Sequence, residues 1–169
     1  MSPGARKVAL TTHVTFSVGW LGAVAVSLAL AIAGLMSDDS RIVRSAYLSM
    51  RLIGWWILVP LSFASLSSGL VQALGTHWGL FRHYWVIVKL LMNIFATSVL
   101  LLYMQTLTYL ADAVAAAGRS DADLLSLRSP SPVLHSAGAL LLLLMATVLS
   151  VFKPRGMTRY GWRREAVTR

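Results

Sequence analysis

Four long stretches of this sequence contain no Asp, Glu, Lys or Arg: residues 8–37, 52–81, 90–111 and 129–152. Each is longer than the ~20 residues that an α-helix needs to cross about 30 Å of hydrocarbon. Membrane-spanning β-strands would be about half as long and would alternate polar and apolar residues, which these stretches do not do. The sequence therefore predicts four transmembrane helices.

The composition agrees with this interpretation. Hydrophobic residues make up 57% of the 169 residues and charged residues only 12%, whereas soluble domains contain about 25% charged residues. We expect one domain, residues 1–169, with the all-α fold of a polytopic membrane protein, an antiparallel bundle of four transmembrane helices. The expected helices cover about residues 8–36, 46–74, 84–113 and 132–152, and a basic tail, residues 153–169, follows them.

Prolines mark local features of two of these helices. Pro60 lies inside the second expected helix and should kink it, because proline lacks an amide donor and clashes with the preceding turn. Ser131 followed by Pro132 is typical of a helix N-cap with proline at the first helical position. The fourth helix should therefore begin at Pro132.

The net charge of +9 is concentrated at helix ends, in loops and in the tail. This placement is typical of topology signals and lipid-headgroup contacts, so we expect a lipid bilayer as the partner and not nucleic acid. The positive-inside rule then predicts a multi-pass protein of the cell membrane with both termini cytoplasmic. In that orientation nine basic residues lie inside and four outside, namely Arg6, Lys7, Arg82, Lys153, Arg155, Arg159, Arg163, Arg164 and Arg169 against Arg41, Arg44, Arg119 and Arg128.

No sequence motif indicates catalysis. The chain has no cysteine, which excludes disulfides, iron–sulfur clusters, c-type haem attachment and thiolate metal sites. It also lacks the Gly-x-Ser-x-Gly, His-Glu-x-x-His and Walker patterns. A non-enzymatic role is the better hypothesis, and imidazole, carboxylate and carbonyl groups are the ligands that remain for a metal.

Ionisable residues within a membrane span are candidates for function, because burying a charge in hydrocarbon costs several kcal/mol. At the cytoplasmic end of the expected bundle, the candidate site residues are His13, His77, His83, Lys89 and Asn93. Lys89 and Asn93 are four residues apart and therefore share one helix face. Lys89 either extends towards the lipid headgroups or faces the bundle near His13.

Histidine could supply a cofactor site at this end. Neutral imidazole binds metals and haem through a ring nitrogen, and haem b needs two axial ligands at similar depth. His13 paired with His83 or His77 meets that condition, so haem b or a divalent metal is the cofactor hypothesis. The alternative is that His13 only forms a hydrogen bond with a neighbouring helix.

A second cluster lies near the outer face and comprises Arg51, Tyr103, Gln105, Asp112 and His135. Arg51 and Asp112 could form an ion pair between the second and third helices. Tyr103 lies at the depth of His135 and could act as its second ligand. A proton or ion path through this cluster would ordinarily need an acidic residue deep in the membrane, and the sequence has none there.

Three segments resemble a group of small, uncharacterised bacterial integral membrane proteins with four helices: GWLGAVAVSLALAIAGL, SLSSGLVQALGTHWGLFRHYWVIVKLLM and LSVFKPRGMTRYGWR. The resemblance implies the same topology and brings no activity, so it assigns no functional residue. A looser resemblance, in helix count and histidine placement, is to four-helix b-type cytochromes and copper-resistance-type membrane proteins. That resemblance implies haem or metal binding, although this sequence lacks paired histidines within its spans.

These observations leave three functional hypotheses. The first is a redox or accessory protein that binds haem b or a metal at the cytoplasmic end of the bundle. The second is a structural or accessory subunit of a larger membrane complex, without a cofactor. The third is a small transporter or channel that works as a homo-oligomer, because four short helices rarely enclose a pathway alone.

Overall fold

The structure, a computed structural model, describes residues 1–75, 79–117, 121–154, 156–159 and 161–163. Its helices are α1 (Pro3–Met36), α2 (Ser40–Ile53), the π-helix η1 (Gly54–Leu58), α3 (Val59–Gly75), α4 (Tyr84–Ala116), α5 (Asp121–Ser126) and α6 (Ser131–Phe152). The described residues contain no strand, only an isolated bridge between His83 and Met157. Four helical segments, of 34, 36, 33 and 22 residues, are long and apolar enough to cross a membrane, which confirms the all-α class.

Two helices begin earlier than expected because polar caps lie outside the apolar stretches. The Ser2 hydroxyl accepts a hydrogen bond from the Ala5 amide, and α1 begins directly after it. The second span begins at Ser40 and not near residue 46, because the Asp39 carboxylate accepts a hydrogen bond from the Arg41 amide at 2.9 Å. Charged residues interrupt the apolar stretch there without interrupting the helix.

The expected capping role of Ser131 is wrong. Pro130 occupies the N-cap position of α6, no side chain caps this end, and Ser131 is already helical. The Ser131 hydroxyl instead donates to the Tyr103 hydroxyl on α4, at 3.4 Å. Its bond therefore joins two helices instead of capping one.

The second span is continuous but irregular at its centre. In η1 the Val59 amide donates to the Gly54 carbonyl, five residues earlier, directly before Pro60. A π-helix, which is one of the recognised sources of helix distortion, therefore lies directly before Pro60, where the sequence predicted a kink. The helices approach closely here, because a Cβ atom at Gly54 would lie 2.6 Å from the sulfur of Met104 on α4, and the methionine side chain would have to shift to accommodate it.

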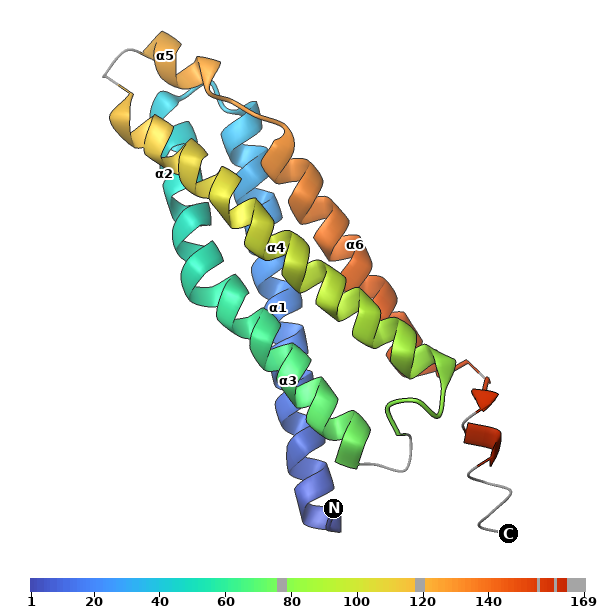
Figure 1. Cartoon of the computed structure of the whole chain (residues 1–169). Coiled ribbons are helices and arrows are strands. Elements are labelled where there is room, and N and C mark those ends of the chain that lie inside the picture. The colour runs from blue at the N-terminus through green and yellow to red at the C-terminus, as the bar shows by residue number, and fades with distance from the viewer. Residues whose placement is uncertain (76–78, 118–120, 155, 160, 164–169) are drawn as a thin grey trace.

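The four long segments lie lengthwise beside one another (Figure 1). Helix α1 packs against α2, α3 and α6, and α4 packs against the same three helices. We call the end that holds the start of α1 and the last turn of α6 the terminal end. The opposite end, with residues 37–39 and α5, is the loop end.

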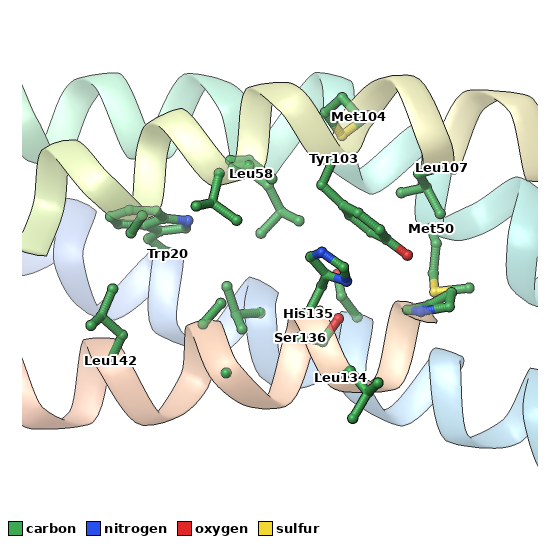
Figure 2. Close-up of a pocket in the computed structure, with 18 of the residues that line it drawn as sticks. Trp20, Met50, Leu58, Tyr103, Met104, Leu107, Leu134, His135, Ser136 and Leu142 are labelled. Carbon is green, nitrogen blue, oxygen red and sulfur yellow. The ribbon is translucent and has the colours of Figure 1, made fainter. Parts of the chain in front are cut away.

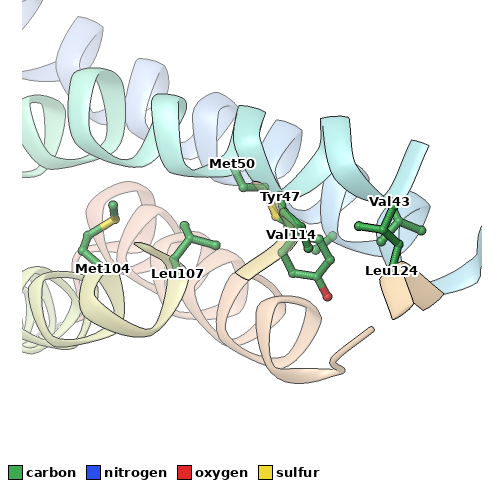
Figure 3. Packing of buried hydrophobic residues seen from close by; sticks show 8 residues of the cluster. Val43, Tyr47, Met50, Met104, Leu107, Val114 and Leu124 are labelled. Carbon is green, nitrogen blue, oxygen red and sulfur yellow. The ribbon is translucent and has the colours of Figure 1, made fainter. Parts of the chain in front are cut away.

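The buried hydrophobic residues gather towards the loop end (Figure 3). That cluster contains Val43, Tyr47, Met50, Met104, Leu107 and Val114. A second cluster nearer the middle of the molecule contains Trp20, Val24, Leu58 and Ala96. Beyond it, towards the terminal end, the buried positions of α3 are serines, Ser62 and Ser65.

Candidate functional site

A line of polar side chains joins three helices at the terminal end. His13 Nδ1 lies 3.1 Å from Ser68 Oγ, and Ser17 Oγ lies 3.0 Å from Ser65 Oγ. The Asn93 amide on α4 donates to the same Ser65 oxygen at 3.4 Å. We call these five residues the polar seam. The seam brings His13 and Asn93 together with serines of α1 and α3.

The contacts of Ser68 fix the role of His13 in the seam. The Ser68 hydroxyl donates its proton to the Ala64 carbonyl at 2.6 Å, so it must accept from His13 Nδ1. The imidazole packs against Gly69, where a Cβ atom would lie only 3.0 Å from its Cε1 atom. His13 therefore acts as an interhelical hydrogen-bond donor, the alternative that the sequence had left open.

Lys89 lies beside the seam. Its ammonium group lies 5.8 Å from the ring centre of Trp85, one turn nearer the terminal end, in cation–π geometry. This contact favours the interpretation in which Lys89 extends towards the lipid headgroups and does not face the bundle.

The environment of His83 differs from that of His13. His83 is the N-cap residue of α4 and pairs with Met157 of the tail, while its ring centre lies 6.4 Å from that of Trp85. The tail is held there by bonds from the Tyr84 amide to the Gly156 carbonyl, 3.3 Å, and from the Thr158 amide to the Arg82 carbonyl, 3.0 Å. The basic tail therefore docks on the segment that precedes α4.

The proposed histidine ligands are not brought to one centre by the described contacts, since His13 contacts α3 and His83 contacts the tail. His77, like Arg155, Arg164 and Arg169 of the tail, lies outside the described residues. Within the described part of the chain, no three His, Cys, Asp or Glu side chains are grouped to hold a metal ion. Haem or metal ligation by these histidines stays a prediction.

The outer cluster separates into two pairs. Arg51 forms the ion pair with Asp112 that the sequence suggested, joining α2 to α4. The side chains are 36% and 64% exposed, which is typical of a surface ion pair and not of a buried site. Gln105 is exposed and belongs to neither pair.

Tyr103 and His135 form the second pair. Their rings stack with centroids 3.8 Å apart and an interplanar angle of 15°. Two rings in direct contact cannot bind opposite faces of a haem, which needs the macrocycle between its axial ligands. Tyr103 and His135 thus lie side by side, but they form an aromatic contact and not a pair of axial haem ligands.

A cavity of about 340 Å³ opens beside this pair, between α1, α2, η1, α4 and α6. Tyr103 on α4 and His135 on α6 meet at its wall (Figure 2). Most of the lining is apolar; the polar members are Trp20, Ser27, Tyr103, His135 and Ser136. The cavity could not be predicted from the sequence, because it is bounded by residues from five elements far apart in the chain.

Ser27 forms part of the cavity wall on α1. Its side chain is buried, with 5% of the residue surface exposed, and its hydroxyl has no hydrogen-bond partner among the described residues. Buried hydroxyl groups are nearly always satisfied by protein or water. An unsatisfied hydroxyl on a cavity wall indicates a place where a bound molecule can supply the partner.

Comparison with protein-family models, curated proteins and solved structures finds no match for this chain.

Proposed function

We propose that this chain is a non-enzymatic protein of the cell membrane that binds a small apolar molecule in the cavity between α4 and α6. The cavity itself carries the proposal, since ligand sites are typically apolar hollows of about 300–1,000 Å³ with a few polar groups. In this reading the four long helices form an antiparallel transmembrane bundle, and the cavity lies within the thickness of the bilayer.

The exposed rim of the cavity supports entry from the lipid phase. Phe95 on α4 and Leu134 on α6 are 61% and 68% exposed, and Gly138 is exposed between the two helices. A Cβ atom added at Gly138 would meet nothing within 4 Å, so the rim is open there. In a bilayer this side opening would face acyl chains, and a ligand dissolved in the membrane could reach it without crossing water.

The docked tail supports the proposed topology. Thr158 and Arg82 share a backbone hydrogen bond, so the tail and the segment before α4 must lie on one side of the membrane. The chain must then cross the membrane an even number of times between these two segments. Two antiparallel spans, α4 and α6, would provide these crossings. The basic residues on both segments favour the cytoplasmic side under the positive-inside rule.

Photo-crosslinking tests the proposal. The protein in lipid nanodiscs is exposed to an alkyl probe that carries a diazirine, and labelled peptides are mapped by mass spectrometry. We expect labels on the cavity-lining segments 95–107 and 134–142. Gly138→Leu should abolish this labelling by filling the rim, whereas Gly22→Leu should not, because Gly22 is an equally open helical glycine on α1 away from the cavity.

Labelling spread evenly over all lipid-facing surfaces, and unchanged in Gly138→Leu, would contradict the proposal. The accessory-subunit hypothesis would then be the better one. Both glycine variants should retain the elution profile of the parent protein, since neither new Cβ atom meets a neighbour.

A further inference from the structure

The hydrogen bonds at the polar end of the cavity restrict the chemistry of its ligand, if the proposed function holds. His135 Nδ1 lies 2.9 Å from the carbonyl oxygen of Ser131, one turn earlier in α6. A carbonyl oxygen can only accept, so Nδ1 carries a proton. A neutral His135 therefore presents the lone pair of Nε2, which has no hydrogen-bond partner among the described residues.

Tyr103 provides the complementary group. The Ser131 hydroxyl lies 3.4 Å from His135 Nδ1 and donates to the Tyr103 oxygen at 3.4 Å. Because the Tyr103 oxygen accepts in this bond, its own proton is left to donate elsewhere. The stacked rings thus place one acceptor, Nε2, and one donor, the phenol proton, at the same end of the cavity.

The rest of the lining excludes a charged group. No Asp, Glu, Lys or Arg occurs among the described residues that line the cavity. The nearby Arg51 is already paired with Asp112. An ionised headgroup would lose its hydration here without gaining a counter-charge, which is strongly unfavourable.

We infer that the ligand of this cavity is an uncharged amphiphile with a hydroxyl head, an alcohol or a phenol, whose O–H donates to His135 Nε2 and whose oxygen accepts from Tyr103. A hydroxyl matches this donor–acceptor pair because it supplies one proton and two lone pairs. The apolar body of the ligand extends along the cavity towards Trp20 and Leu142 (Figure 2).

Three matched probes test this inference: 4-pentylphenol, its methyl ether 4-pentylanisole, and 4-pentylbenzoate. Binding is measured by calorimetry in nanodiscs, with Gly138→Leu nanodiscs as the reference for partition into lipid. The phenol should bind roughly tenfold more tightly than the ether, the range expected for one hydrogen bond. The benzoate should not bind above the reference.

Two variants separate the two hydrogen bonds. His135→Phe keeps an aromatic ring against Tyr103 but removes the acceptor, so the preference for the phenol over the ether should disappear. In the parent protein, the oxygen atoms of both the phenol and the ether can accept a hydrogen bond from Tyr103. Tyr103→Phe removes this donor, so both probes should lose affinity equally and the preference for the phenol should remain.

Equal binding of phenol and ether to the parent protein, or tighter binding of the benzoate, would overturn the hydroxyl inference while leaving the cavity as a ligand site. Binding of all three probes that is indistinguishable from the Gly138→Leu reference would instead overturn the proposed function. The two failures are therefore distinguishable in one set of measurements.

Discussion

The two ends of the molecule are held together by different interactions. At the loop end, Tyr47, Val43 and Met104 are among the largest side chains that are less than 2% exposed, and they belong to one cluster of buried residues. At the terminal end, the helices meet through the polar seam. Lipid tails are as apolar as Val or Met, so the hydrophobic effect contributes little to helix association within a bilayer. Close packing and hydrogen bonds must then supply the free energy of association.

The property that selects the neighbours of each helix therefore differs between the two ends. At the loop end, the close fit of large side chains determines which helices pack together. At the terminal end, the matching of hydrogen-bond donors and acceptors determines it. The cavity lies between the two apolar clusters, with Met50 of the loop-end cluster on one side and Trp20 and Leu58 of the middle cluster on the other.

Truncating Tyr47 should have the largest effect on stability. Tyr47→Ala removes a ring that is 1% exposed and leaves the Ser129 amide without the hydroxyl that accepts from it at 2.9 Å. We expect a loss of about 3–5 kcal/mol in the free energy of unfolding, as for other buried aromatic residues. Unfolding by SDS in mixed micelles measures it. Tyr109→Ala, at a side chain that is 72% exposed, is the control and should change little.

Removing the shared hydroxyl of the seam should have a smaller effect. Ser65→Ala deletes the oxygen that Ser17 and Asn93 both contact, and we expect a loss of about 1 kcal/mol, as for other hydrogen bonds between membrane helices. Ser67→Ala, on the exposed face of α3, is the matched control. If Ser65→Ala lowered the free energy of unfolding as much as Tyr47→Ala, the seam would stabilise the protein as strongly as the apolar cluster, which would contradict this comparison.

Replacing His13 tests whether the seam is structural. His13→Ala removes one bond to Ser68, so the expected loss is about 0.6 kcal/mol in the same SDS titration. The oxidised and reduced absorption spectra of the purified protein should be the same before and after the change. A Soret band that disappears in both His13→Ala and His83→Ala would instead establish the haem site that the sequence predicted.

The smallest expected effect comes from Asp39 at the start of α2. The side-chain hydrogen bond from Arg41 lowers the pKa of the Asp39 carboxyl below its usual value. The ionised Asp39 carboxylate therefore contributes fully to stability above its pKa in the unfolded state, about 4. This contribution is lost as the pH falls through its lower pKa in the folded state. Thermal unfolding between pH 7 and pH 2 should show this decline in the parent protein. Asp39→Asn keeps a capping oxygen and should remove this part of the pH dependence.

Much of the fold could be predicted because it depends on local patterns. The apolar stretches located all four long helices to within a few residues, apart from the early start of the second span. That start was missed because Arg41 and Arg44 lie within a helix that extends beyond the apolar stretch. The helix α5 was also missed, since only six residues form it.

The site was harder to predict because it depends on contacts between distant residues. Depth along each helix correctly placed Tyr103 beside His135 and Arg51 beside Asp112. Depth does not give the rotation of a helix about its axis, which decides whether a residue meets a neighbour or lipid. The bonds of His13 to Ser68 and of Asn93 to Ser65 depend on that rotation, and so does the cavity.

Insertions and deletions should act unequally along the second span because of η1. A π-helix contains one residue more than the α-helical turn that it replaces. Deleting one residue of 54–58 would restore a regular α-helical turn and leave the same face of α3 towards the seam, because the widened turn accommodates the extra residue. Deleting Leu61, in the regular helix α3, would instead rotate the rest of α3 by about 100° and turn Ser65 and Ser68 away from the seam. A change of one residue in length should therefore be tolerated better within η1 than one turn later.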